Sequence, residues 1–221
     1  MTLRLGAAVL LLWAAPARAS LGAFEPSVGE PRAEFRLSGR HVAREGGMTI
    51  CTDGVIRDPE RARVIRARDR NHQEQTALTT GRRRPLDPDV VPYFVLPRGF
   101  GGARLGDLAL VSYRGRSVWA VAGDRGPCEG CQIGRRGHRR RYAFGEGSVA
   151  LARALGVPGA EDGDGGGAAD GVTYLVFPGS GPGRPFESQE SLLAHIERGA
   201  SDILERYFSA PRPLRLAAAA P

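Results

Sequence analysis

The sequence predicts a mainly β, single-domain protein with a few helices. Its 221 residues suffice for one well-packed domain and are short for two. Its 31 glycines and 16 prolines favour short strands and turns over a helical bundle. The apolar segments between these residues are short and are bounded by turn residues, which is typical of strands.

The first nineteen residues are predicted to be a secretory signal peptide. A positive start at Arg4 precedes an apolar run at residues 5–15, which is too short to span a bilayer stably. Residues 17–19 (Ala-Arg-Ala) form a small-x-small cleavage site, whereas the alternative is an uncleaved anchor or a buried N-terminal helix. We expect an exported, soluble mature protein with an irregular arm at residues 20–44, a folded domain at 45–209 and a disordered tail at 210–221.

The charge balance is basic, at +7 for the whole chain and +5 once Arg4 and Arg18 are removed with the signal peptide. The chain has no lysine, and alanine and glycine are abundant, so part of this charge reflects a composition bias. A basic surface favours an anionic partner such as nucleic acid or cell wall. Because the protein is expected to be exported and its arginines are scattered, we expect neither a nucleic-acid nor a membrane partner. We expect a monomer.

The first strand is predicted at residues 48–54, where apolar and polar residues alternate before an Asp-Gly turn. Asp53 at its end is either a site residue or a turn former that bonds its own backbone. Residues 57–70 are dense in charge and are expected at the surface, with one helical turn starting at Asp58-Pro59. The polar residues 69–76, which include an isolated His72, line a cleft or form a solvated loop.

Four more strands are predicted further along the chain. Residues 93–97 are apolar on both faces and belong in the core. Residues 108–113 and 117–122 form a hairpin around Arg114-Gly115. A flexible linker at 158–171 leads to the last core strand at 172–177.

Two helices are predicted in the second half of the chain. The first covers residues 149–155, with Ser148 as N-cap and Gly156 as its end. The second follows Ser188, and its apolar residues recur at helical spacing, so we expect it to pack on the sheet or barrel. These residues are Leu192, Leu193, Ile196, Ile203, Leu204, Tyr207 and Phe208.

Cys51, Cys128 and Cys131 are candidates for one disulfide, because an exported protein meets an oxidising environment. Cys128 and Cys131 could close a tight loop, or Cys51 could pair with either of them. The alternative is a zinc site formed by the three cysteines and His138, since the Cys-x-x-Cys spacing fits structural zinc. Export favours the disulfide, and we expect no metal.

Two carboxylates, Asp124 and Glu146, flank an arginine-rich loop at residues 126–144. This loop is a solvated insertion or a binding patch. Burial after an apolar strand would raise the pKa of Asp124 and suit a general acid, whereas a helix N-terminus would keep Glu146 ionised as a base. Such a pair fits hydrolysis of a glycosidic bond. By itself the pattern fits a turn Asp and a helix-capping Glu better than a catalytic pair.

Five segments occur in order along the chain. They are residues 93–97 (YFVLP), 106–109 (GDLA), 121–127 (VAGDRGP), 145–156 (GEGSVALARALG) and 171–180 (GVTYLVFPGS). Together they resemble the glycoside hydrolase family 75 chitosanases over about residues 45–180. The resemblance implies endo-hydrolysis of β-1,4 bonds in chitosan with inversion, without a cofactor, and it assigns catalysis to Asp124 and Glu146. The residues that we predict to bind the polysaccharide are Asp53, Tyr93, Asp107 and Arg125.

A wider resemblance concerns the fold. The Asp124-Arg-Gly-Pro segment followed by a Ser-capped helix resembles the double-psi β-barrel domains of septal lytic transglycosylases and expansins. We therefore expect a double-psi β-barrel-like domain with a groove and one or two packed helices. The alternative function is a barrel that binds cell-wall glycan, or acts on peptidoglycan, without chitosanase activity.

Overall fold

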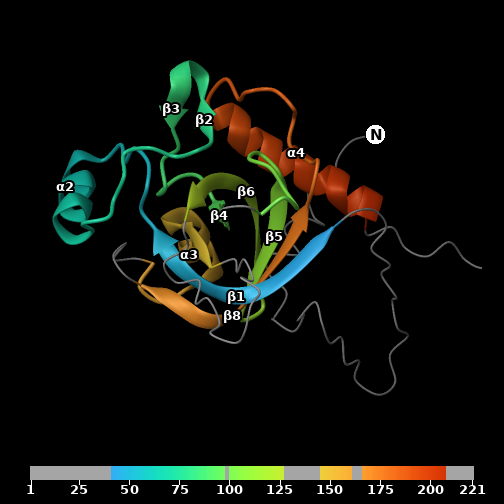
Figure 1. Cartoon of the computed structure of the whole chain (residues 1–221), viewed down its shortest axis with the longest axis horizontal. Helices are drawn as coiled ribbons and strands as arrows, with labels where there is room; N and C mark the ends of the chain where they lie inside the picture. The colour runs from blue at the N-terminus through green and yellow to red at the C-terminus, as the bar shows by residue number, and fades with distance from the viewer. Residues whose placement is uncertain (1–40, 98–99, 127–144, 161–165, 208–221) are drawn as a thin grey trace, which may run out of the picture.

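The computed structural model describes residues 41–97, 100–126, 145–160 and 166–207 (Figure 1). The predicted signal peptide, the arginine-rich loop from residue 127 and the predicted tail lie outside these ranges. Within them the chain forms a closed barrel of six strands, with helices packed around it. This architecture confirms the predicted mainly β fold with a barrel core.

The order of strands around the barrel is β1-β7-β4-β6-β5-β8. The strands are β1 (Val42–Cys51), β4 (Tyr93–Pro97), β5 (Leu108–Tyr113), β6 (Arg116–Gly126), β7 (Glu146–Ser148) and β8 (Gly167–Phe177). Two pairs, β1 with β7 and β4 with β6, are parallel, and the other neighbours are antiparallel. The predicted hairpin between β5 and β6 is confirmed.

Two strands are longer than predicted. β1 begins at Val42, inside the predicted irregular arm, and β8 begins at Gly167, inside the predicted linker. The two strands pair over this stretch, where Gly167 lies opposite Thr49. A Cβ atom on Gly167 would lie 2.5 Å from the carbonyl oxygen of Met48, so the close approach of the two backbones requires glycine. The glycine-rich composition that indicated a linker therefore belongs in part to a strand.

The charged segment after β1 forms a full helix, α2 (Pro59–Arg68), where a single helical turn was predicted. The predicted start is confirmed, because the Asp58 side chain accepts a hydrogen bond from the backbone N–H of Arg61. Only Ala62 and Ile65 of this helix are buried, so its remaining face is solvated. α2 and the short ribbon of β2 (Thr79–Thr80), η1 (Gly81–Arg83) and β3 (Arg84–Pro85) project from the barrel (Figure 1).

The two predicted helices are confirmed as α3 (Val149–Leu155) and α4 (Gln189–Tyr207). The Ser148 side chain accepts a hydrogen bond from the N–H of Leu151, and Gly156 ends α3 in the left-handed conformation. α4 lies against the outside of the barrel, with Leu192 and Ile196 in the core (Figure 1). In the described ranges, no helix combines the length and the apolar character needed to cross a membrane.

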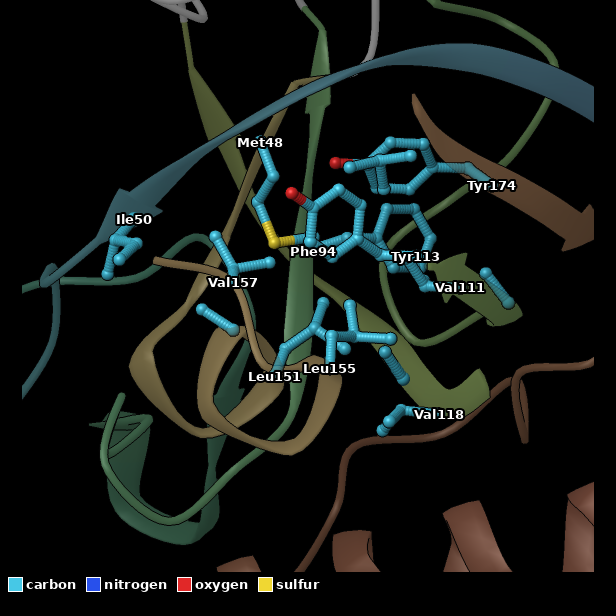
Figure 2. Close-up of a cluster of buried hydrophobic side chains, with 14 of the residues drawn as sticks. Met48, Ile50, Phe94, Val111, Tyr113, Val118, Leu151, Leu155, Val157 and Tyr174 are labelled. Atoms are coloured by element: carbon cyan, nitrogen blue, oxygen red, sulfur yellow. The ribbon is translucent and has the colours of Figure 1, made fainter. Parts of the chain in front are cut away.

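The buried side chains form two clusters on opposite faces of the barrel wall. Successive residues of a strand point to opposite faces, so Phe94 and Leu96 join one cluster while Tyr93 and Val95 join the other. Figure 2 shows the first cluster, in which Leu151 and Leu155 of α3 reach toward Phe94. The second cluster lies between the barrel and α4, and we call its side of the wall the α4 face. β4 is buried throughout, as predicted from its sequence.

Candidate active site

A cavity of about 690 Å³ opens at the end of the barrel where β1 and β6 finish and β7 begins. Barrel residues on its lining are Thr49–Asp53, Val95, Asp124, Arg125, Gly126 and Glu146. The opposite wall is formed by residues 68–77, which follow α2, and we call this segment the 68–77 wall. Both predicted catalytic carboxylates thus line one cavity.

A β-bulge at Gly123 directs the Asp124 side chain into this cavity. β4 and β6 run parallel, and Phe94 lies opposite Ala122. The next residue, Val95, lies opposite Asp124, so Gly123 is an extra residue in β6. Without the bulge, strict alternation would place Asp124 on the face of Ala122. The bulge places it on the α4 face together with Val95, which lines the cavity.

Glu146 lies on the other side of Val95. β7 runs antiparallel to β4, with Phe94 opposite Gly147, and this register puts Glu146 next to Val95. Asp124 and Glu146 therefore lie on either side of Val95. Two strand spacings separate them, which is about 9.5 Å between their Cα atoms. The two side chains can approach each other from opposite sides of one strand.

The Glu146 carboxylate reaches toward the end of β6. A Cβ atom on Gly126 would lie 3.7 Å from Oε2 of Glu146. Gly126 is two residues beyond Asp124 on β6, so both point to the same face of the wall. The side chains of Asp124 and Glu146 therefore lie on one face of the barrel wall, on the two sides of Val95.

Asp124 is buried and is held by backbone amides. Its Oδ1 accepts hydrogen bonds from the backbone N–H of Ala77, at 2.8 Å, and from the backbone N–H of the next residue, Arg125, at 2.7 Å. Burial raises the pKa of the Asp124 carboxyl, and the two amide hydrogen bonds oppose part of this increase. A carboxyl group with a raised pKa remains protonated to higher pH, as a proton donor must.

Asp53 is a second perturbed carboxyl in the same cavity. Burial raises its pKa to about 6, a hydrogen bond from the backbone N–H of Gln73 opposes the increase, and the charge of Asp124 adds to it. The Gln73 hydrogen bond measures 2.7 Å to Oδ1, and the backbone carbonyl of Asp53 accepts a hydrogen bond from the Tyr93 hydroxyl. The strand end predicted to carry a site residue therefore brings Asp53 into the cavity.

Three side chains could offer ligand atoms to a metal ion. Sγ of Cys51 and one carboxyl oxygen each of Asp53 and Asp124 lie within 4.8 Å of one another. Burial raises the pKa of the Cys51 thiol well above its usual value, and the nearby carboxylates Glu146 and Asp53 raise it further. A thiol that stays protonated is a poor metal ligand. Burial thus raises the pKa of all three acids in this cluster.

The 68–77 wall is polar, and sequence analysis left its role open between a cleft and a solvated loop. The structure supports the cleft, because all of these residues except His72 and Glu74 line the cavity. The Thr52 hydroxyl donates a hydrogen bond to Asp69 at 2.5 Å and lies 3.5 Å from Nδ1 of His72, which ties the wall to β1. Thr52, Asp69 and Arg70 were not predicted as site residues. The density of polar residues was the available signal for them.

Two of the four predicted substrate-binding residues lie away from the cavity lining. Tyr93 is fully buried, and its hydroxyl supports the Asp53 carbonyl. Asp107 is also buried, and its carboxylate accepts hydrogen bonds from the backbone N–H groups of Arg104, Gly179 and Gly181. The structure therefore gives both residues a supporting role.

Arg125 and Cys51 lie on the cavity lining. Arg125 is exposed there, whereas Cys51 is a buried free thiol whose sulfur lies 3.4 Å from the Tyr93 hydroxyl. Cys128, Cys131 and His138 lie outside the described residues, so the disulfide and the zinc site both stay sequence predictions.

The chain matches a known protein family over residues 48–202, which is most of its length. The family model describes a fungal chitosanase of glycosyl hydrolase group 75. No curated protein matches the chain. The matched region contains the barrel strands from Met48 onward, α3, most of α4, and every carboxylate of the cavity. The chain therefore belongs to the group 75 glycosyl hydrolases, the fungal chitosanase family, and is a glycoside hydrolase that acts on a polysaccharide.

Proposed function

We propose that this hydrolase is an exported endo-chitosanase that cleaves β-1,4 bonds with inversion, using Asp124 and Glu146 as its acid and base. The observation that carries the proposal is the placement of both carboxylates on one face of the barrel wall, on the two sides of Val95 and along one cavity. An inverting site needs its two carboxyl groups about 6.5–9.5 Å apart to admit water.

Asp124 acts as the general acid in this mechanism. Its burial favours the protonated form, which gives its proton to the glycosidic oxygen as the bond to the anomeric carbon breaks. Glu146 removes a proton from a water molecule on the opposite face of the sugar ring. The resulting hydroxide attacks the anomeric carbon and inverts its configuration. The reaction ends with Asp124 ionised and Glu146 protonated, and solvent restores both.

The test is a reducing-end assay on soluble chitosan with the wild type and the Asp124→Asn and Glu146→Gln variants. Each substitution removes one proton-transfer group, so we expect kcat to fall by at least about 10²-fold. Glu205→Gln, which changes an exposed residue of α4, controls for the change in charge and keeps full activity. Proton NMR of the first products reports the anomer that is formed. A variant of either carboxylate with wild-type kcat, or products that retain their configuration, would contradict the proposal.

A second candidate is cleavage of a less cationic glycan, such as peptidoglycan. Three arginines, Arg68, Arg70 and Arg125, line the same cavity as the carboxylates. They would repel the ammonium groups of fully deacetylated chitosan. Parallel assays on chitosan, chitin and peptidoglycan distinguish the two candidates: release of reducing ends from peptidoglycan alone supports the second, and release from chitosan supports the first.

Export is part of the proposal and rests on the signal-like residues 1–19. Cleavage after Ala19 would leave Ser20 as the first residue of the mature protein. N-terminal sequencing of protein recovered from outside the cytoplasm is expected to start at Ser20, and a start at Met1 would count against export.

A further inference from the structure

Asp53 is a third carboxyl in the cavity and has no role in a two-carboxylate mechanism. A carboxyl oxygen of Asp53 and one of Asp124 lie within 4.8 Å of each other, although Asp53 follows β1 and Asp124 lies in β6. Both side chains line the cavity, and both are more than half buried. Two carboxylates this close in a partly buried site resist simultaneous ionisation.

The 68–77 wall holds both carboxyls through its backbone. The N–H of Gln73 donates to Oδ1 of Asp53, and the N–H of Ala77 donates to Oδ1 of Asp124. In the part of the chain that the structure describes, no hydrogen bond reaches Oδ2 of either side chain. One segment therefore orients the pair and leaves one oxygen of each carboxyl free to hold a proton.

Several charged or titratable groups surround the Asp53 carboxyl. The charges of Asp124 and Asp69 favour its protonated form, and His72 favours its ionised form. The other such groups on the cavity lining, apart from Asp69, are Cys51 from β1, Arg68 and Arg70 from the 68–77 wall, Arg125 from β6 and Glu146 from β7. Tyr93 from β4 contacts the backbone of Asp53.

We propose that Asp53 is a positioning residue that shares one proton with Asp124 and so keeps the pair protonated while the enzyme works. This proposal rests on the proposed role of Asp124 as general acid. In the resting enzyme the proton favours Asp53, because Asp124 has two amide donors to stabilise its anion and Asp53 has one. When the proton resides on Asp124 it is transferred to the leaving oxygen, and solvent then reprotonates the pair.

The proposal predicts the direction in which the pH dependence of kcat changes when Asp53 is replaced. The alkaline limb of the profile reports loss of the last proton from the pair. In Asp53→Asn the carboxyl that holds the proton at rest is gone, so the last proton is held by Asp124 alone, whose two amide donors stabilise its anion. The alkaline limb of the kcat profile then moves to lower pH. Asp53→Glu keeps the second carboxyl and keeps the limb close to its wild-type position.

The first experiment measures kcat on soluble chitosan from pH 4 to pH 8 for the wild type, Asp53→Asn and Asp53→Glu. Glu60→Gln on the exposed face of α2 removes the same charge far from the pair and serves as the control. The expected result is a shifted alkaline limb in Asp53→Asn alone. An unshifted limb overturns the proposal. Loss of activity at every pH in a folded Asp53→Asn protein also overturns it, because Asp53 would then act directly.

The second experiment does not depend on activity. Carbon-13 NMR of labelled aspartate carboxyls follows the titration of Asp53 in the wild type and in Asp124→Asn. The expected result is a midpoint at about 6 in the wild type and a lower midpoint in Asp124→Asn. Equal midpoints overturn the shared proton even if the enzyme cleaves chitosan. A shifted midpoint in a protein that leaves chitosan intact supports the pair and contradicts the proposed function alone.

Discussion

At the scale of single residues, the site depends on Gly123, which has no functional group. It is the extra residue of the bulge that turns Asp124 toward the cavity. A Cβ atom at this position would lie 2.5 Å from Cβ of Tyr93 and 3.0 Å from a methyl group of Leu86. Both neighbours are fully buried and cannot move aside. The residue before Asp124 must therefore be glycine for a steric reason.

Gly123→Ala is expected to destabilise the protein by about 1–3 kcal/mol, because the new methyl group overpacks a filled core. We also expect kcat to fall at least about tenfold, because a shift of β6 misplaces Asp124. Urea unfolding and the chitosan assay measure the two effects. Gly101→Ala is the control, since a Cβ atom there meets nothing within 4 Å. Wild-type stability and activity in Gly123→Ala would refute this account of the bulge.

At the scale of secondary structure elements, β7 and α3 are joined to β4 through Ser148. Its hydroxyl accepts hydrogen bonds from the N–H groups of Tyr93, at 3.0 Å, and Leu151, at 3.2 Å. It also donates to the carbonyl of Val91 at 2.8 Å. Ser148 is fully buried, so one side chain caps a helix and ties the strand that carries Glu146 to the barrel.

Ser148→Ala is expected to destabilise the protein by about 2–3 kcal/mol, because it removes the helix cap and leaves buried backbone groups without partners. Thermal or urea unfolding measures the change. Ser201→Ala is the matched control, since that hydroxyl is exposed on α4 and donates to the Glu197 carbonyl of its own helix. A Ser148→Ala protein no less stable than the control would show that the cap contributes little.

At the scale of the whole molecule, the barrel is covered on both faces of its wall. α3 packs into one hydrophobic cluster and α4 into the other. The second cluster includes Val95 and Cys51, which also line the cavity. α4 and the site therefore share one core, although α4 follows every catalytic candidate in the sequence.

Leu192→Ala in α4 is expected to destabilise the whole barrel by about 2–5 kcal/mol, in a single unfolding transition, because it leaves a cavity in this shared core. Leu193→Ala alters the next residue, which is only partly buried, and is expected to cost less. Chemical unfolding followed by tryptophan fluorescence reports on the core, since the ring centroids of Trp119 and Phe177 lie 5.6 Å apart in the same cluster. Separate transitions for α4 and the barrel would contradict a shared core.

Several elements could be predicted because their signals are local. An alternating or wholly apolar run identified β4, β5 and β6, and Ser148 and Gly156 identified the ends of α3. The start of β8 could not be predicted in this way, since Gly167 has the composition of a linker and becomes a strand residue only when β1 lies beside it. α2 was underestimated because few of its residues are apolar.

The sequence by itself determined the family motifs, the mainly β composition and the two carboxylates named as acid and base, because each depends on residues close together in the chain. Only the tertiary structure decided which groups meet. It brought a carboxyl oxygen of Asp53 within 4.8 Å of one of Asp124, and it placed residues of the 68–77 wall on the cavity lining. It placed Asp107 and Tyr93 away from that lining. These outcomes depend on strand register, on one bulge and on closure of the barrel, which are set by contacts between residues distant in sequence.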